Sequence, residues 1–307
     1  MKLIPWGPGA LPTSAIALGC MRLERYNAKE AAGYIETAME EGIRFFDHAD
    51  IYGAGRCESL FGEAFALTGI NREDVWVQSK CGIVSGVMYD FSKEHILSSV
   101  DGILKRLNME YLDSLLLHRP DALMEPEAVA ETFDILQSSG KVRHFGVSNH
   151  RPSQMELMKK FLHQPLVVDQ MQLSIAFSGM IASGMETNME TEGSVDHDGD
   201  VLNYCRLHDI TIQTWSPFQY GCFAGPFLGN LEKYPDLNRE LEKLAGQYET
   251  TPTAIAAAWI LRHPAKFQMI AGTTSKQRMG DILRGSEITL TRPEWYRLYL
   301  SAGHILP

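Results

Sequence analysis

The sequence has few cysteines, and no two of them lie close together in the chain. Five cysteines are scattered over 307 residues, and none form a Cys-x-x-Cys pair. An odd, scattered set does not build a disulfide framework. It favours reduced thiols, so we predict a cytoplasmic protein. The five are Cys20, Cys57, Cys81, Cys205 and Cys222.

Long apolar runs and excess positive charge are also missing. No apolar stretch approaches the roughly 18 residues of a membrane-spanning helix, and residues 1–7 lack the apolar core of a secretory signal. Lys and Arg number 28 against 38 Asp and Glu, a net charge of −10. Such a balance argues against general affinity for nucleic acid or for an anionic membrane. We therefore predict neither as a partner.

The chain also has no low-complexity tract and no convincing linker. With 45% hydrophobic residues, 307 residues can form one large core or two ordinary ones. We predict one domain spanning residues 1–307. The pattern makes no prediction of oligomeric state.

Short apolar segments alternate with helical patterns at a repeat of about 30 residues. Such alternation is typical of a parallel sheet with crossover helices. Eight units predict an α/β fold, the (β/α)₈ TIM barrel, with a short N-terminal hairpin in residues 1–13 as a cap. The alternative is a doubly wound open sheet, but no Gly-x-Gly-x-x-Gly follows the first strand. The strands are expected near residues 15, 43, 75, 112, 142, 166, 210 and 267.

One stretch, residues 174–200, interrupts the alternation. It carries several acids and neither Lys nor Arg. We predict a solvated loop; a loop of this length in a compact barrel is usually a lid, a binding loop or a mobile segment. Residues 196–200, Asp-His-Asp-Gly-Asp, are similar to part of a calcium loop but lack its spacing and its closing Glu. We predict no metal there.

Four chemically active side chains lie at or just after the ends of predicted strands: Asp47, Tyr52, Lys80 and His118. In a TIM barrel these strand ends meet at one mouth, where catalytic residues gather. An ammonium near a phenol favours the phenolate and lowers a pKa that is ordinarily about 10. Asp47 is the nearest counter-ion for a buried Lys80. A neutral His118 can orient a carbonyl oxygen. The four predict a proton-donating site.

Several separated motifs in chain order resemble those of the aldo-keto reductases. The match spans about residues 15–285 and is closest to bacterial oxidoreductases with the Asp-His-Ala-Asp-Ile-Tyr-Gly form. The motifs are Phe46 to Gly53, Ser79-Lys80, Leu117 to Pro120, Gly146 to Asn149, Asp169-Gln170, Trp215 to Pro217 and Gly272 to Ser275.

This resemblance implies reduction of a small aldehyde or ketone by NADPH. Tyr52 is then the proton donor to the carbonyl oxygen, and Lys80, held by Asp47, lowers its pKa. His118 positions the carbonyl. The residues that the resemblance places against the cofactor are Met21, Asp47, Ser148, Asn149, Gln170, Trp215, Ser216, Pro217, Phe218, Gly221 and Phe223.

A local positive patch supports NADPH independently. Residues 262–280 contain four Lys or Arg and no acid. Hydroxyls, a helix N-terminus and a guanidinium together make a phosphate site, and the resemblance places the 2′-phosphate there. Two residues depart from the family pattern: Gly272 replaces a common lysine, and Ile282 replaces an asparagine that meets the adenine. The phosphate-site residues are Thr273, Thr274, Ser275, Lys276 and Arg278.

The substrate is not named by these motifs, because specificity resides in the loops after the strands. We expect Phe177, Met180, Tyr220 and Phe227 to line an apolar pocket.

Two other functions compete with the reductase. A metal-dependent barrel hydrolase would use Asp47, His48, Asp50 and His118 as ligands, although such sites usually need more histidines. A regulatory module would bind the cofactor with little turnover. In the reductase, His48 and Asp50 are either supports of the catalytic residues or merely polar loop residues, and we favour supports.

Overall fold

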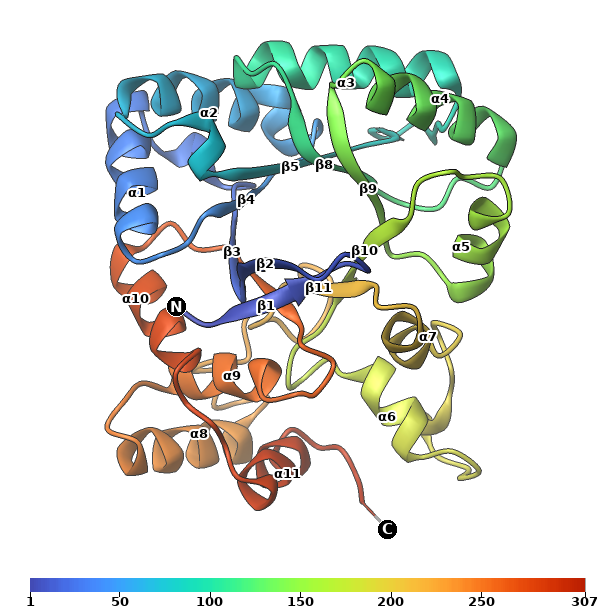
Figure 1. Cartoon of the computed structure of the whole chain (residues 1–307). Coiled ribbons are helices and arrows are strands. Elements are labelled where there is room, and N and C mark those ends of the chain that lie inside the picture. Colours follow the sequence, from blue (N-terminus) through green and yellow to red (C-terminus); the bar gives the residue numbers. More distant parts are fainter. Residues whose placement is uncertain (307) are drawn as a thin grey trace.

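The computed structural model describes residues 1–306, and eight of its strands close into a parallel barrel (Figure 1). Around the barrel the order is β10-β11-β12-β3-β4-β5-β8-β9. The predicted TIM barrel is confirmed. The strands are β3 (Ile16–Gly19), β4 (Phe45–Asp47), β5 (Trp76–Cys81), β8 (Leu112–Leu117), β9 (Val142–Ser148), β10 (Leu166–Gln172), β11 (Thr211–Trp215) and β12 (Gln268–Ala271).

Helices surround the barrel (Figure 1). Side chains cap several of them: Asn27 and Glu30 form a reciprocal capping box, and the Ser92 hydroxyl accepts from the His95 amide. Among residues 1–306, no helix has the length and apolar character needed to cross a membrane. The helices are α1 (Ala28–Glu40), α2 (Arg56–Leu67), α3 (Lys93–Leu107), α4 (Pro126–Ser138), α5 (Pro152–Lys159), α6 (Gly179–Met185), α7 (Val201–Leu207), α8 (Pro235–Gln247), α9 (Pro252–Leu261), α10 (Lys276–Gly285) and α11 (Arg292–Ser301).

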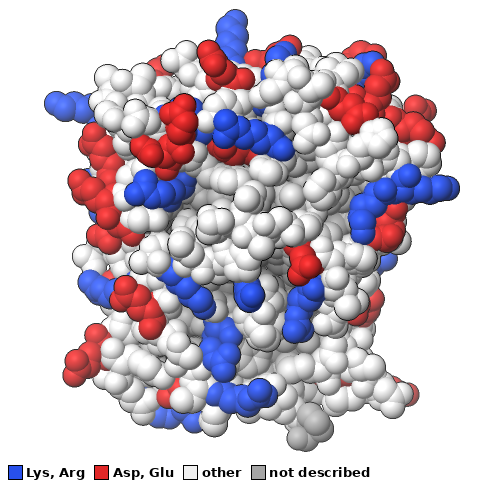
Figure 2. Space-filling view, viewed as in Figure 1, with Lys and Arg blue, Asp and Glu red and all other residues white. Residues whose placement is uncertain are grey.

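The predicted N-terminal hairpin closes one end of the barrel. It pairs β1 (Leu3–Trp6) with β2 (Leu11–Ser14) and lies in front of the barrel in Figure 1. The buried Trp6 ring lies 5.9 Å from Phe45 and 5.0 Å from Trp76, at the starts of β4 and β5. In the same view, Figure 2 shows a largely uncharged centre on this face. The strand C-termini therefore meet at the opposite end, the mouth.

The expectation of a loop throughout residues 174–200 is wrong for part of that stretch. Helix α6 occupies Gly179–Met185, and Met180, Ile181 and Ala182 within it are buried. A short 3₁₀ turn follows at Glu192–Ser194. The apolar side chains on α6 account for the helix, because they pack into the main core. Its role as a lid remains a prediction.

Candidate active site

A buried ammonium lies at the centre of the mouth. The Lys80 side chain, near the end of β5, is 0% exposed. Its Nζ donates to the Asp47 carboxylate at 2.8 Å, to the His48 carbonyl at 2.7 Å and to the Tyr52 hydroxyl at 3.2 Å. An ammonium has three hydrogens, and each has an acceptor here. This arrangement fits a charged Lys80, and burial without partners would be costly.

A left-handed turn brings Tyr52 to this ammonium. Gly53, Ala54 and Gly55 have φ values of 57°, 54° and 87°. Left-handed backbone favours glycine, and a Cβ on Gly53 would also lie 2.5 Å from the Glu24 carboxylate. Tyr52 lies directly before this turn, and its hydroxyl accepts from Lys80. The contact of Tyr52 with Lys80 is thus next to a turn whose backbone conformation favours glycine.

Opposing influences act on the pKa of Tyr52. Burial raises it most, the Lys80 ammonium lowers it, and the Asp47 carboxylate raises it further, so the pKa stands above its ordinary value. Lys80 thus acts on the pKa in the expected direction, but desolvation outweighs it in the protein alone. For Lys80, burial lowers the pKa, but Asp47 and Tyr52 outweigh burial and the pKa is raised.

His118 follows β8 beside the phenol. Its ring centroid lies 6.0 Å from that of Tyr52, at an interplanar angle of 82°. Burial, assisted by the charges of Lys80 and Arg119, holds the pKa of His118 well below its usual range. The imidazole is therefore neutral at physiological pH. Its Nδ1 is buried and has no hydrogen-bond partner within residues 1–306.

The neighbours His48 and Asp50 take different positions. The His48 imidazole is buried edge-on against Phe61, with centroids 4.5 Å apart, and burial lowers its pKa to about 3. Its backbone carbonyl, in contrast, holds Lys80. Burial raises the pKa of Asp50 to about 7. Within residues 1–306, no three His, Cys, Asp or Glu side chains are grouped as a metal site.

A hydrogen-bonded row continues the site across β9, β10 and β11. The Ser148 hydroxyl donates to the Gln170 carbonyl at 2.9 Å, and the Asn149 amide donates to Ser148 at 2.7 Å. The Trp215 indole nitrogen donates to Asn149 at 3.2 Å. The Gln170 amide nitrogen donates to Asp47 at 3.0 Å. The structure thus brings these four predicted cofactor residues together beside the catalytic candidates.

The loop after β11 folds back on itself. The Phe227 amide donates to the Phe218 carbonyl at 3.0 Å, and Tyr220 pairs with Gly225 at 3.1 Å. Phe223, at the tip, is 71% exposed. Ser216 and Pro217 lead into this loop directly from Trp215, and Gly221 lies near its tip.

Two of the predicted substrate walls are wrong. Phe227 is 0% exposed and Met180 is 6% exposed, and both belong to the main hydrophobic core. Phe177 is exposed and Tyr220 is half-buried. Only these two of the four remain available to line a pocket.

The segment after β12 has the chemistry of a phosphate site. Ser275 caps α10 by accepting from the Arg278 amide at 3.2 Å. The Thr273 and Thr274 carbonyls accept from the hydroxyls of Tyr34 and Tyr26. These bonds fix the turn, so the N-terminus of α10 is held in place as an anion-binding feature.

The basic side chains of this segment differ in availability. Lys276 donates to the Gly33 carbonyl at 3.0 Å, whereas the exposed Arg278 guanidinium has no partner within residues 1–306. Arg22 donates to the Gly272 carbonyl at 3.0 Å. The sequence analysis missed Arg22, although its place just after β3 and Met21 was a usable signal. Ile282 is buried in the core.

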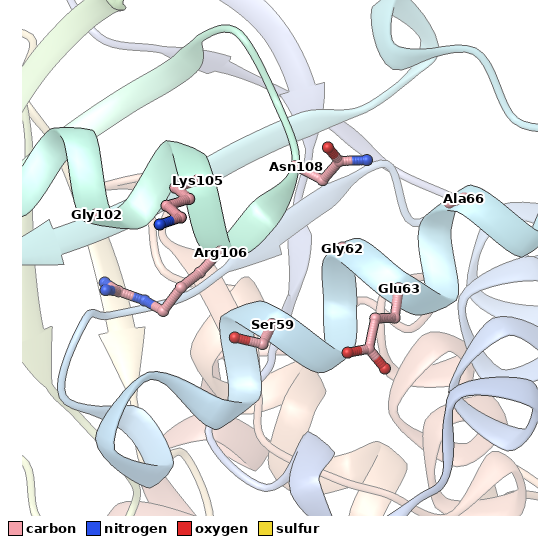
Figure 3. A pocket seen from close by; sticks show the side chains of 8 residues that line it. All are labelled: Ser59, Gly62, Glu63, Ala66, Gly102, Lys105, Arg106 and Asn108. Carbon is pink, nitrogen blue, oxygen red and sulfur yellow. The ribbon is translucent and has the colours of Figure 1, made fainter.

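Two cavities are lined by none of the four predicted catalytic residues. One, of about 720 Å³, lies between α2 and α3 (Figure 3). Another, of about 340 Å³, borders Asp50, Ile51 and Ala54 behind the Tyr52 turn. Arg106 lines both and donates to the buried Glu58 carboxylate at 2.7 Å. Neither cavity includes Tyr52, Lys80 or His118.

Known proteins resemble this chain in sequence and in fold. Residues 15–299 match the Aldo/keto reductase family. The chain is 35% identical over 310 residues to "Uncharacterized oxidoreductase YcsN" of Bacillus subtilis (strain 168), covering 97% of each chain. It is 31% identical over 318 residues to "Oxidoreductase YdhF" of Escherichia coli (strain K12), covering 100% of this chain and 99% of the relative. The crystal structure of a thermostable aldo-keto reductase, Tm1743, with the inhibitor epalrestat is similar in fold, with a TM-score of 0.77 and 24% identity over 98% of this chain and 100% of the other.

Proposed function

This chain belongs to the aldo/keto reductase family, and from that premise we propose that it reduces an aldehyde or ketone to an alcohol with NADPH. The observation that carries the proposal is the contact of a buried, charged Lys80 with the Tyr52 hydroxyl at 3.2 Å. The contact places the Tyr52 phenol, the proposed acid, beside the Lys80 ammonium, which stabilises the phenolate. General acid catalysis needs such a pair.

Each catalytic side chain has one role in the proposal. Tyr52 is protonated at neutral pH and donates its proton to the carbonyl oxygen. Lys80 stabilises the phenolate that remains, and Asp47 balances the charge of Lys80. Neutral His118 donates a hydrogen bond to the carbonyl oxygen and holds it against Tyr52. When bound, NADPH supplies the hydride.

The row at the mouth fits the nicotinamide end of the cofactor. We assign the amide contacts to Ser148, Asn149 and Gln170, and the flat contact to the Trp215 ring. The polar atoms converge there, and the indole nitrogen is already satisfied by Asn149, which fixes the ring plane. Met21, Asp47 and the loop of Ser216, Pro217, Phe218, Gly221 and Phe223 complete the proposed contacts.

The segment after β12 fits a phosphate. Arg278 and the N-terminus of α10 supply the free guanidinium and the helix dipole. Arg22 adds positive charge beside Gly272. We assign the 2′-phosphate to this group, together with Thr273, Thr274, Ser275 and Lys276. NADPH is therefore favoured over NADH.

We also propose that residues 1–307 act as one catalytic domain in the cytoplasm. The continuous barrel and its shared core support the first part. The five cysteines are free thiols, which supports the second.

The test is turnover. Purified protein is mixed with NADPH and a panel of aldehydes and ketones, and both NADPH consumption and alcohol formation are measured. We expect matched consumption and alcohol on at least one carbonyl. Tight NADPH binding without turnover on any compound would instead favour a cofactor-binding regulatory module. Hydrolysis that is lost on chelation would favour the metal-dependent hydrolase.

A further inference from the structure

The inside of the barrel contains a column of buried glutamines. Gln78, Gln170, Gln213 and Gln268 come from β5, β10, β11 and β12, and each is at most 3% exposed. Buried amides are costly unless they are hydrogen-bonded. They are far apart in sequence, and barrel closure brings them together.

Near the mouth, two of these amides hold Asp47. The Gln78 nitrogen donates to Asp47 Oδ1 at 2.7 Å and to Gln213 Oε1 at 2.8 Å. The Gln170 nitrogen donates to Asp47 Oδ1 at 3.0 Å and to Gln213 Oε1 at 2.9 Å. The same carboxylate binds Lys80 at 2.8 Å. Asp47 is therefore held from the barrel interior as well as by its counter-ion.

The column continues to the closed end. The Gln213 nitrogen donates to Gln268 Oε1 at 2.8 Å and to Gln78 Oε1 at 3.2 Å. The Gln268 nitrogen donates to the Ser14 carbonyl at 2.8 Å and to the Thr13 hydroxyl at 3.4 Å. An amide nitrogen carries two hydrogens. Both hydrogens of every glutamine in the column are thus used.

The two ends fix the direction of the column. The Ser14 carbonyl is only an acceptor, so Gln268 turns its nitrogen to it and its oxygen to Gln213. Gln213 then presents its oxygen to Gln78 and Gln170, whose nitrogens face Asp47. An ionised carboxylate is also only an acceptor. The same amide orientations therefore satisfy both ends, and they suit Asp47 as an anion.

We propose that Gln78, Gln213 and Gln268 are positioning residues that hold Asp47, and through it the Lys80–Tyr52 pair, from the closed end of the barrel. This role deepens the proposed reductase function and rests on it. None of the three touches the Lys80 ammonium or Tyr52; they act through Asp47. Gln170 also binds Asp47 but is assigned to the cofactor, so it is left out of the test.

Loss of an amide that binds Asp47 should change the acidity of Tyr52 through the charge of Asp47. The ionisable groups around Tyr52 are Lys80 on β5, Asp47 on β4, His118 after β8 and Cys20 after β3. Asp47 opposes ionisation of the phenol, and the amide donors partly offset its charge. Loss of a donor leaves more of that charge uncompensated. The phenol then becomes a weaker acid.

The experiment compares methionine substitutions along the column, because methionine has similar bulk and no amide. Gln78→Met should lower kcat about tenfold and move the alkaline limb of the pH profile upward by about half a unit, with KM nearly unchanged. Gln213→Met should show a smaller effect and Gln268→Met the smallest. The control is Val77→Ala, which removes buried bulk from the same strand and should leave the pH profile unchanged.

A second measurement needs no turnover. Tyrosine labelled at Cζ gives an NMR signal for Tyr52, assigned by its loss in Tyr52→Phe. In Gln78→Met this signal should move at neutral pH and begin to titrate at higher pH, whereas Val77→Ala should match the parent protein. An unchanged signal in folded Gln78→Met, or an equal change in Val77→Ala, would overturn the positioning role. If no carbonyl is reduced but the signal moves as expected, the proposed reaction fails and the column stands. If Gln78→Met does not fold, Gln213→Met decides in the same way.

Discussion

The two ends of the barrel contain different kinds of side chain. At the closed end, Trp6 packs among aromatic rings, and its side chain is fully buried. At the mouth, a buried ion pair of Lys80 and Asp47 meets a phenol on a left-handed turn. Burial of apolar side chains stabilises a fold and introduces no reactive group. Burial of a charge pair carries a desolvation cost, but it places charged groups where they can act on a bound substrate. The reactive groups therefore gather at the mouth, whereas the closed end contributes mainly packing.

Removing the acid tests the mouth most severely. Tyr52→Phe deletes the hydroxyl and keeps the ring, so we expect a loss of about a thousandfold in the rate of carbonyl reduction. NADPH binding should change little, because only the proton donor is removed. Steady-state turnover and tryptophan fluorescence measure the two quantities. A variant that keeps most of its rate would show that Tyr52 is not the acid.

Removing the ammonium tests whether the ion pair carries stability as well as chemistry. Lys80→Met leaves Asp47 buried without its counter-ion, which should lower the free energy of unfolding by about 3–5 kcal/mol. Urea denaturation measures this loss. Adding Asp47→Asn should recover most of the stability but none of the activity. If the double variant is no more stable than Lys80→Met, the buried charge is not the cause.

The closed end should show the reverse pattern. Trp6→Ala opens a cavity under the hairpin and should lower the free energy of unfolding by about 3–5 kcal/mol. Because Trp6 lies far from the mouth and outside the glutamine column, kcat should stay within about twofold. Denaturation and turnover below the melting temperature measure both. A large fall in kcat with intact fold would contradict the separation of the ends.

The phosphate site sharpens the account of the mouth. Arg278→Gln removes the free guanidinium and should weaken NADPH binding by roughly tenfold, with little effect on NADH. The matched control on the same helix is Arg284→Gln, because Arg284 pairs with Asp281 and lies in the last turn. Titration of each variant with both cofactors measures the difference. Equal weakening of NADH would remove the 2′-phosphate from this site.

The smallest expected effect is that of pH on kcat/KM. The pKa of Tyr52 lies above the ordinary tyrosine value of about 10, so the phenol stays protonated at every pH up to that value. The pKa of His118 is lowered, so its neutral form persists below 6.5. In the reducing direction, kcat/KM should therefore be nearly constant from about pH 7 to about pH 10. A break near pH 6.5 that persists in Asp50→Asn would show that His118 titrates normally, because the pKa of Asp50 is itself about 7.

The barrel and its mouth were predictable from the sequence for a simple reason. Strand ends are visible where an apolar run meets Asp47, Lys80 or His118, and a barrel sends all such ends to one mouth. The resemblance to a known family added the residues proposed to bind the cofactor, and the structure brings Ser148 and Trp215 to the same row.

Other features needed the packed structure. An apolar loop residue such as Phe227 has the same sequence signal whether it lines a pocket or fills the core. The pKa of Tyr52 depends on burial, which the lysine in the sequence does not report. The contact of Gln78 with Gln213 joins residues 135 positions apart and follows only from the strand order of the closed barrel.

The most direct test of the central claim is a titration of the purified protein with NADPH and with NADH, followed by tryptophan fluorescence. We predict tight NADPH binding with quenching, weaker NADH binding, and loss of most of the quenching in Trp215→Phe. Binding of neither cofactor would contradict a nicotinamide-dependent reductase. It would also leave the site at the mouth without its proposed source of hydride.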